Sequence, residues 1–146
     1  MIEQNMIELD SEIMSLPMED YVEGPWLYKR RSEEGKGWWY MVYASGGKEG
    51  GETISYAMAP EVTGPWTYKG MITGTAKDSY TIHPGIVDFK GHTYLFYHNS
   101  TLSLHGYGPA TGRRSVCVDE MFYNPDGTIR PVTQTYGKPA SAKAAK

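Results

Sequence analysis

This chain of 146 residues has little cysteine, no long apolar run and no excess of basic residues. Its one cysteine, Cys117, excludes an intrachain disulfide and a zinc site built from several cysteines. No apolar segment approaches the roughly 20 residues that cross a bilayer, and the first residues lack the basic and apolar regions of a signal peptide. A net charge of -3 and a pI near 5.8 give no basic surface that would attract nucleic acid. We therefore expect neither a nucleic-acid nor a membrane partner, and the compartment stays open.

The chain is rich in tyrosine, tryptophan, glycine and proline, with 12, 4, 17 and 9 residues respectively. Aromatic residues favour strands, while glycine and proline favour turns. The composition therefore predicts an all-β protein. Cys117 lies in the strand-like run Ser115–Val118, where a buried apolar role is favoured over a nucleophilic one.

Alternating apolar and aromatic runs bounded by turn residues predict several short strands. Two weak strands around a turn are expected within residues 1–20, and Asp126–Gly127 supplies the positive φ angles of a late turn. A tail of small residues, lysine and proline over 137–146 is typical of a disordered end or an expression scar. The expected strands lie within 26–30, 38–44, 53–58, 64–68, 80–89, 93–98 and 114–123.

A Gly-Pro-Trp segment occurs twice, in Tyr21–Lys29 and in Thr63–Lys69, and only the first copy contains an acid, Glu23. We expect both copies to form the same Gly-Pro turn at the start of a strand. The aromatic runs Trp38–Ala44 and Tyr94–Asn99 are also alike. Recurring units of about four antiparallel strands indicate propeller blades, and a Greek-key sandwich is the alternative.

Four motifs together resemble the last part of glycoside hydrolase family 43, in order from about residue 5 to residue 129. They are Val22–Trp26, Ile82–Ile86, Phe96–Asn99 and Arg114–Glu120. The family contains β-xylosidases and α-L-arabinofuranosidases with a five-bladed β-propeller. The resemblance implies an incomplete propeller of two to three four-stranded blades over residues 1–136.

The resemblance also implies an inverting reaction that uses three acidic residues. Glu23 matches the general acid, which protonates the leaving group while a base activates water on the other side. Flanking Val22, Pro25 and Trp26 offer apolar walls that would raise the pKa of this acid. The general base and the aspartate that adjusts the acid's pKa belong to earlier blades, and no residue here corresponds to them.

Two further residues match family positions that bind substrate. His83 resembles the histidine at the propeller axis, which faces the substrate or holds a central metal, often Ca²⁺, directly or through water. Arg114 resembles an arginine that donates to sugar hydroxyls, although the adjacent Arg113 makes the assignment depend on register. The tryptophans Trp38, Trp39 and Trp66 are expected to pack within sheets rather than to stack on sugars.

Two functions stay open at this stage. The first is hydrolysis of xylosyl or arabinofuranosyl linkages in hemicellulose, with no required cofactor and with the absent carboxylates supplied by assembly. The second is an inactive sugar-binding or structural remnant of such an enzyme. Because a propeller needs four or more blades to close, we expect a homodimer or higher oligomer that covers the open faces.

Overall fold

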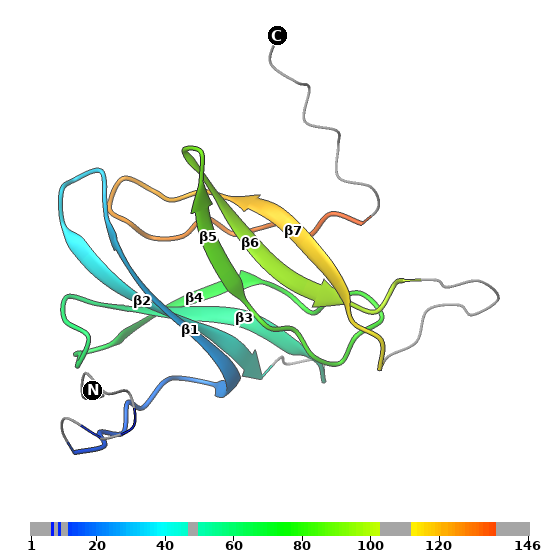
Figure 1. The fold of residues 1–146 in the computed structure, drawn as a ribbon, viewed down its shortest axis with the longest axis horizontal. Helices are drawn as coiled ribbons and strands as arrows, with labels where there is room; N and C mark the ends of the chain where they lie inside the picture. Colours follow the sequence, from blue (N-terminus) through cyan, green and yellow to red (C-terminus); the bar gives the residue numbers. More distant parts are fainter. Residues whose placement is uncertain (1–6, 8, 10–11, 47–49, 103–111, 137–146) are drawn as a thin grey trace, which may run out of the picture.

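The computed structural model describes residues 7, 9, 12–46, 50–102 and 112–136. Within these residues there is no helix, and seven strands form two antiparallel sheets. The first sheet has the order β1-β2-β3-β4 and the second has the order β5-β6-β7 (Figure 1). The strands are β1 (Tyr21–Arg31), β2 (Gly37–Gly46), β3 (Glu52–Ala59), β4 (Thr67–Thr73), β5 (Gly85–Phe89), β6 (His92–Asn99) and β7 (Ser115–Met121).

Each sheet is a simple meander, because every strand pairs with the strand that precedes or follows it. No described strand crosses from one sheet to the other, so the Greek-key alternative is not the observed topology. Short antiparallel meanders are the blade pattern of propellers. The fold class is therefore all-β with two propeller blades, of which the described residues give one four strands and the other three. The described residues also contain no helix long and apolar enough to span a membrane.

The hydrophobic core lies between the two sheets and draws on both. Alternate residues of each strand point to one face, so the first sheet contributes side chains such as Tyr40 and Ile54, and the second contributes Leu95, all three fully buried. Ile82, which joins the sheets just before β5, is also fully buried. Trp38 and Cys117 pack against the same core, as expected from their strand-like contexts.

The two Gly-Pro-Trp segments do not form the same structure, contrary to the sequence prediction. Gly24 and Pro25 lie inside β1, whose pairing with β2 shifts register on both sides of Glu23. Gly64 and Pro65 lie in the connection before β4, which is the last strand of the same sheet. The repeat therefore does not mark two blades. The likeness of Trp38–Ala44 and Tyr94–Asn99 does, because these segments fall in β2 and β6, the second strands of the two sheets.

The segment that follows β7 returns to the first sheet. Tyr40 donates a hydrogen bond to the carbonyl of Gly127 at 2.7 Å, and the N–H of Ile129 donates to the hydroxyl of Tyr56 at 2.9 Å. The N–H of Val132 then donates to a carbonyl of β4 at 2.7 Å. Figure 1 shows this orange segment running beside the β1–β2 hairpin. Residues 124–132 therefore connect the sheets through backbone groups paired with buried tyrosines.

Other predictions have mixed outcomes. The hairpin turn at Lys90–Gly91 is confirmed, with both residues at positive φ. Residues 12–20 contain no strand, so the two weak strands expected there are not found in the described part of this segment. The tail 137–146 and the loop 103–111 lie outside the described residues.

Candidate active site

Glu23 lies at a bulge of β1, which is an edge strand of the first sheet among the described strands. Its pairing with Ala44 interrupts the regular register, and Gly24 beside it has a φ of 61°. A bulge turns one side chain away from the pleated alternation and is common near active sites. Positive φ favours glycine because it has no Cβ. The Glu-Gly-Pro sequence thus aims the carboxylate of Glu23 out of the sheet.

His83 meets this carboxylate from the segment before β5. Its Nε2 lies 2.8 Å from Oε1 of Glu23, and the two side chains are 33% and 49% exposed. The imidazole ring lies against Gly24, where an added Cβ would approach ring atoms to 3.2 Å. Gly24 therefore serves two purposes, since it allows the bulge and leaves room for His83.

The environment lowers the pKa of Glu23 below its ordinary value of 4.5. The largest cause is the hydrogen bond from His83; the charges of His83 and Arg114 add to it, and partial desolvation opposes it. A general acid needs a raised pKa. The raised pKa expected from Val22, Pro25 and Trp26 is therefore not found, because the hydrogen bond from His83 and the neighbouring charges outweigh the effect of desolvation on Glu23.

Arg114 and Arg113 lie just before β7 and act in different places. Arg113 donates to the carbonyl of Leu102 at 2.7 Å. The charge of Arg114 lowers the pKa of Glu23 and, after burial, that of His98. Arg114 is therefore the arginine whose charge reaches the carboxylate; its expected donation to sugar hydroxyls stays a prediction.

Glu52, at the start of β3, is a member of this cluster that the sequence reasoning missed. The residue as a whole is buried, with 8% of it exposed, and its Oε2 accepts the N–H of Ile82 at 3.1 Å. One ligand atom each from Glu23, Glu52 and His83 lies within 4.8 Å of the others. A glutamate at the start of a predicted strand is the only sequence signal, and it does not indicate where the side chain ends.

These three residues also test the expectation of calcium at His83. Ca²⁺ takes six to eight oxygen ligands, whereas the cluster offers two carboxylates and one imidazole nitrogen. These three side chains therefore supply too few oxygen ligands to hold a calcium ion by themselves. Their observed arrangement satisfies the imidazole through Glu23 and the buried carboxylate through the backbone.

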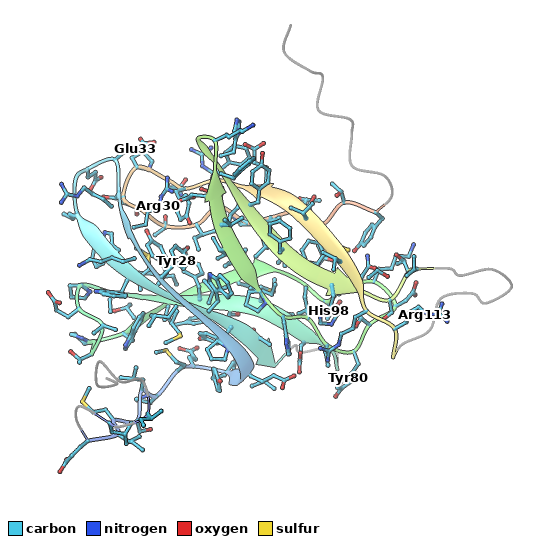
Figure 2. The ribbon with its side chains drawn as sticks, viewed as in Figure 1. Tyr28, Arg30, Glu33, Tyr80, His98 and Arg113 are labelled. Carbon is cyan, nitrogen blue, oxygen red and sulfur yellow. The ribbon has the colours of Figure 1, made fainter. Side chains whose placement is uncertain are left out.

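An ion pair joins the sheets at the other end of the same contact. Arg30 of β1 lies 3.2 Å from Asp88 of β5, and its guanidinium stacks over the ring of Tyr123 at 4.2 Å. Figure 2 labels Arg30 and His98 toward opposite ends of the contact between the sheets. β1 is thus joined to the second sheet at two places, to the segment before β5 by Glu23–His83 and to β5 by Arg30–Asp88.

Comparison with known proteins identifies the family. A family model described as glycosyl hydrolases family 43 matches residues 2–129, which is most of the chain. The chain belongs to glycosyl hydrolase family 43. The β-D-galactofuranosidase xynD of Aspergillus niger is 31% identical to this family 43 chain over 136 residues, covering 90% of the chain and 38% of that protein. A β-xylosidase of Xylanibacter ruminicola is 31% identical over 130 residues, covering 87% and 37%.

Solved structures agree with this assignment. CoXyl43, a β-xylosidase/α-arabinofuranosidase from a compost microbial metagenome, was solved with xylotriose in a calcium-free form. It matches with a TM-score of 0.75 and 28% identity over 90% of this chain and 40% of its own. The family 43 chain thus spans less than half the length of the relatives it matches. The blades described above and the recognition of the family from its four motifs are confirmed.

Proposed function

We propose that this chain carries the general acid, Glu23, of an inverting glycosidase that acts on xylosyl or arabinofuranosyl linkages in hemicellulose. The observation that carries the proposal is the Glu23–His83 contact of 2.8 Å at the bulge of β1, within reach of the charge of Arg114. An imidazole and a guanidinium beside a half-exposed carboxylate form a set of groups that binds sugar hydroxyls and transfers a proton.

The proposal assigns the remaining chemistry to groups outside the described residues. Inversion needs an acid and a base about 6.5–9.5 Å apart, with water between the base and the sugar. Glu52 does not meet this requirement, because it is buried and has a carboxylate atom within 4.8 Å of Glu23. A base from an assembled partner or from further blades completes the reaction in this proposal. A carboxylate of that kind close to Glu23 would also raise the pKa of the acid.

A second candidate function is sugar binding without hydrolysis. The lowered pKa of Glu23 favours it, because a carboxylate that is ionised at neutral pH accepts hydrogen bonds but donates no proton. Arg114 and His83 supply donors to sugar hydroxyls in both candidates. The two candidate functions differ only in whether the completed site raises the pKa of Glu23 enough for it to carry a proton.

Hydrolysis of p-nitrophenyl xyloside and p-nitrophenyl arabinofuranoside separates the candidates. If the protein is a glycosidase, we expect the wild type to hydrolyse these substrates. The rate should fall strongly in Glu23→Gln, which preserves the shape of the side chain and removes the acid. A Glu34→Gln variant is the control, because Glu34 is an exposed residue of the β1–β2 hairpin. If neither wild type nor variant turns over but xylo-oligosaccharides bind and Arg114→Ala abolishes the binding, the protein is a sugar-binding one. Equal turnover by wild type and Glu23→Gln contradicts the assignment of Glu23.

We propose further that two copies assemble through the outer face of the second sheet. Cross-strand pairing places Val87, Phe96 and Val116 on the face opposite the core, where they are 44%, 40% and 81% exposed. Contiguous apolar surface of this kind favours association. Light scattering at micromolar concentration is expected to give a dimer or larger species, and Val116→Asp is expected to shift it toward monomer. A monomeric wild type contradicts the assembly.

A calcium ion at His83 remains a proposal that needs ligands beyond the described residues. It is tested by the melting temperature in CaCl₂ and in EGTA. A calcium-dependent rise that disappears in His83→Ala supports the site, and equal melting temperatures in both solutions contradict it.

A further inference from the structure

Glu52 is bonded twice to the segment that carries His83. Its backbone N–H donates to the carbonyl of Tyr80 at 2.9 Å, and its side-chain Oε2 accepts the N–H of Ile82 at 3.1 Å. The segment has no strand pairing of its own, since β5 begins only at Gly85. In place of strand pairing, Glu52 therefore supplies two hydrogen bonds to the Tyr80–His83 segment.

The cost of placing a carboxylate here shows that the contact is specific. A buried carboxylate is unfavourable unless it is hydrogen-bonded or paired, and Glu52 is only 8% exposed. An apolar residue would satisfy the buried face of β3, whose eight residues are all buried. The carboxylate does what an apolar side chain does not, because it accepts the amide hydrogen of Ile82.

The contact acts directly on the residue that touches Glu23. Ile82 is held from two sides, by its fully buried side chain and by the bond from its N–H to Glu52. His83 follows at once: its Nε2 lies 2.8 Å from Oε1 of Glu23, and one of its ring nitrogens lies within 4.8 Å of carboxylate atoms of both Glu23 and Glu52. If Ile82 lost its hydrogen bond to Glu52, the imidazole of His83 would therefore be expected to move away from Glu23.

We propose that Glu52 is a positioning residue, which fixes the Tyr80–His83 segment so that Nε2 of His83 stays on the carboxylate of Glu23. Its relevance to hydrolysis rests on the proposed function of Glu23 as the acid. The geometric claim does not, because it concerns only where the imidazole lies. The experiment therefore reads the imidazole first and hydrolysis second.

The imidazole nitrogens are observed by long-range ¹H–¹⁵N correlation at one pH, with a chelator present to remove metal ions. Glu23→Gln gives the reference shift of the His83 signals when their partner carboxylate is lost. Glu52→Ala removes the side-chain acceptor of the Ile82 N–H, whereas Glu52→Gln keeps an oxygen that accepts it. The pair His92–Glu120, at 2.5 Å on the second sheet, is the internal control.

We expect the His83 nitrogen signals to move in Glu52→Ala in the direction seen with Glu23→Gln, while His92 does not move. In Glu52→Gln the His83 signals should stay close to the wild-type position, which is rescue by the conservative variant. A folded Glu52→Ala whose melting temperature falls but whose His83 signals do not move overturns the proposal, because Glu52 is then only structural. If Glu52→Ala does not fold, Glu52→Asp, which retracts the carboxylate by one methylene, is measured instead. Movement of its His83 signals supports the proposal, and a lower melting temperature without such movement overturns it.

Hydrolysis is then measured on the wild-type assembly. Misplacing a catalytic group by about 1 Å costs on the order of 100-fold in rate, so kcat should fall about 10- to 100-fold in Glu52→Ala with KM little changed. An unchanged kcat in a variant whose His83 signals have moved overturns the role in catalysis. A wild type without turnover refutes the proposed function alone, and the nitrogen signals still decide the position of His83.

Discussion

Replacing Gly24 by alanine tests whether the bulge of β1 is shaped to admit the imidazole of His83. Gly24 has a φ of 61°, and a Cβ at this position would lie 3.2 Å from two atoms of the His83 ring. The substitution therefore introduces backbone strain and a close contact together. We expect it to lower stability and to displace His83 from Glu23.

A control variant separates the two effects. Gly35 in the β1–β2 hairpin has a φ of 83°, and an added Cβ there meets nothing within 4 Å. Each alanine pays roughly 1–2 kcal/mol for the left-handed backbone. Gly24→Ala adds a contact term of about 1 kcal/mol, at the low end of overpacking costs because a partly exposed ring can shift.

Urea unfolding of both variants measures the free energies, with the slope checked for constancy. The nitrogen signals of His83 report whether the ring has moved. Gly24→Ala should be the less stable of the two and should alone shift His83. Equal free energies of unfolding together with unshifted His83 signals in both variants would refute the reasoning.

Three further predictions follow from burial and pairing. Tyr56→Phe removes the acceptor of the buried Ile129 N–H, so the free energy of unfolding in urea should fall by about 1–3 kcal/mol; no change would mean that water replaces the hydroxyl. Glu23 has a lowered pKa in the folded state, so its contribution to stability is present above pH 4.5 and lost as the pH falls through the lower folded value. Thermal melting from pH 6 to pH 3 should therefore show a weaker pH dependence in Glu23→Gln, and identical profiles would contradict the pairing with His83. Burial raises the pKa of Cys117 above its ordinary 9.0, so mass spectrometry should show slower alkylation at neutral pH in the folded protein than in urea; equal rates would place the thiol at the surface.

Much of the fold follows from local pattern. The second strands Trp38–Ala44 and Tyr94–Asn99 were recognised as equivalent because both are long aromatic runs, and a run buried on one face specifies its own register. The Lys90–Gly91 and Asp126–Gly127 turns follow from residues that accept positive φ. Each of these strands and turns is determined by residues within a short stretch of the chain, so a single sequence suffices to predict it.

The Gly-Pro-Trp repeat shows where local pattern fails. The same three residues lie within a bulged edge strand at Gly24 and in a connection at Gly64. Which structure forms depends on the neighbours: the ring of His83, from another part of the chain, lies against Gly24, whereas the ring nearest Gly64 is that of Trp66 in the same segment. That neighbour is 59 positions away in the sequence, from Gly24 to His83, so the difference is tertiary.

The candidate site divides in the same way. Glu23, His83 and Arg114 were identified from motifs, and the structure brings the first two into contact and the third within electrostatic reach. Glu52 was missed because its role comes from a backbone N–H thirty residues away, which no residue pattern reports. The pKa direction of Glu23 was also wrong, because the largest influence on it is the hydrogen bond from His83, a residue 60 positions away in the sequence.

The segment over residues 124–132 has a consequence for synthesis of the protein. It supplies the backbone partners of Tyr40 and Tyr56, at sequence separations of 87 and 73 residues. While the chain is still emerging from the ribosome, all four strands of the first sheet are outside before these partners exist. Buried hydroxyls without partners are costly, so the first blade completes its core only when the end of the second has been made. The two blades are therefore expected to become stable together, once residues 124–132 have been made, rather than one after the other.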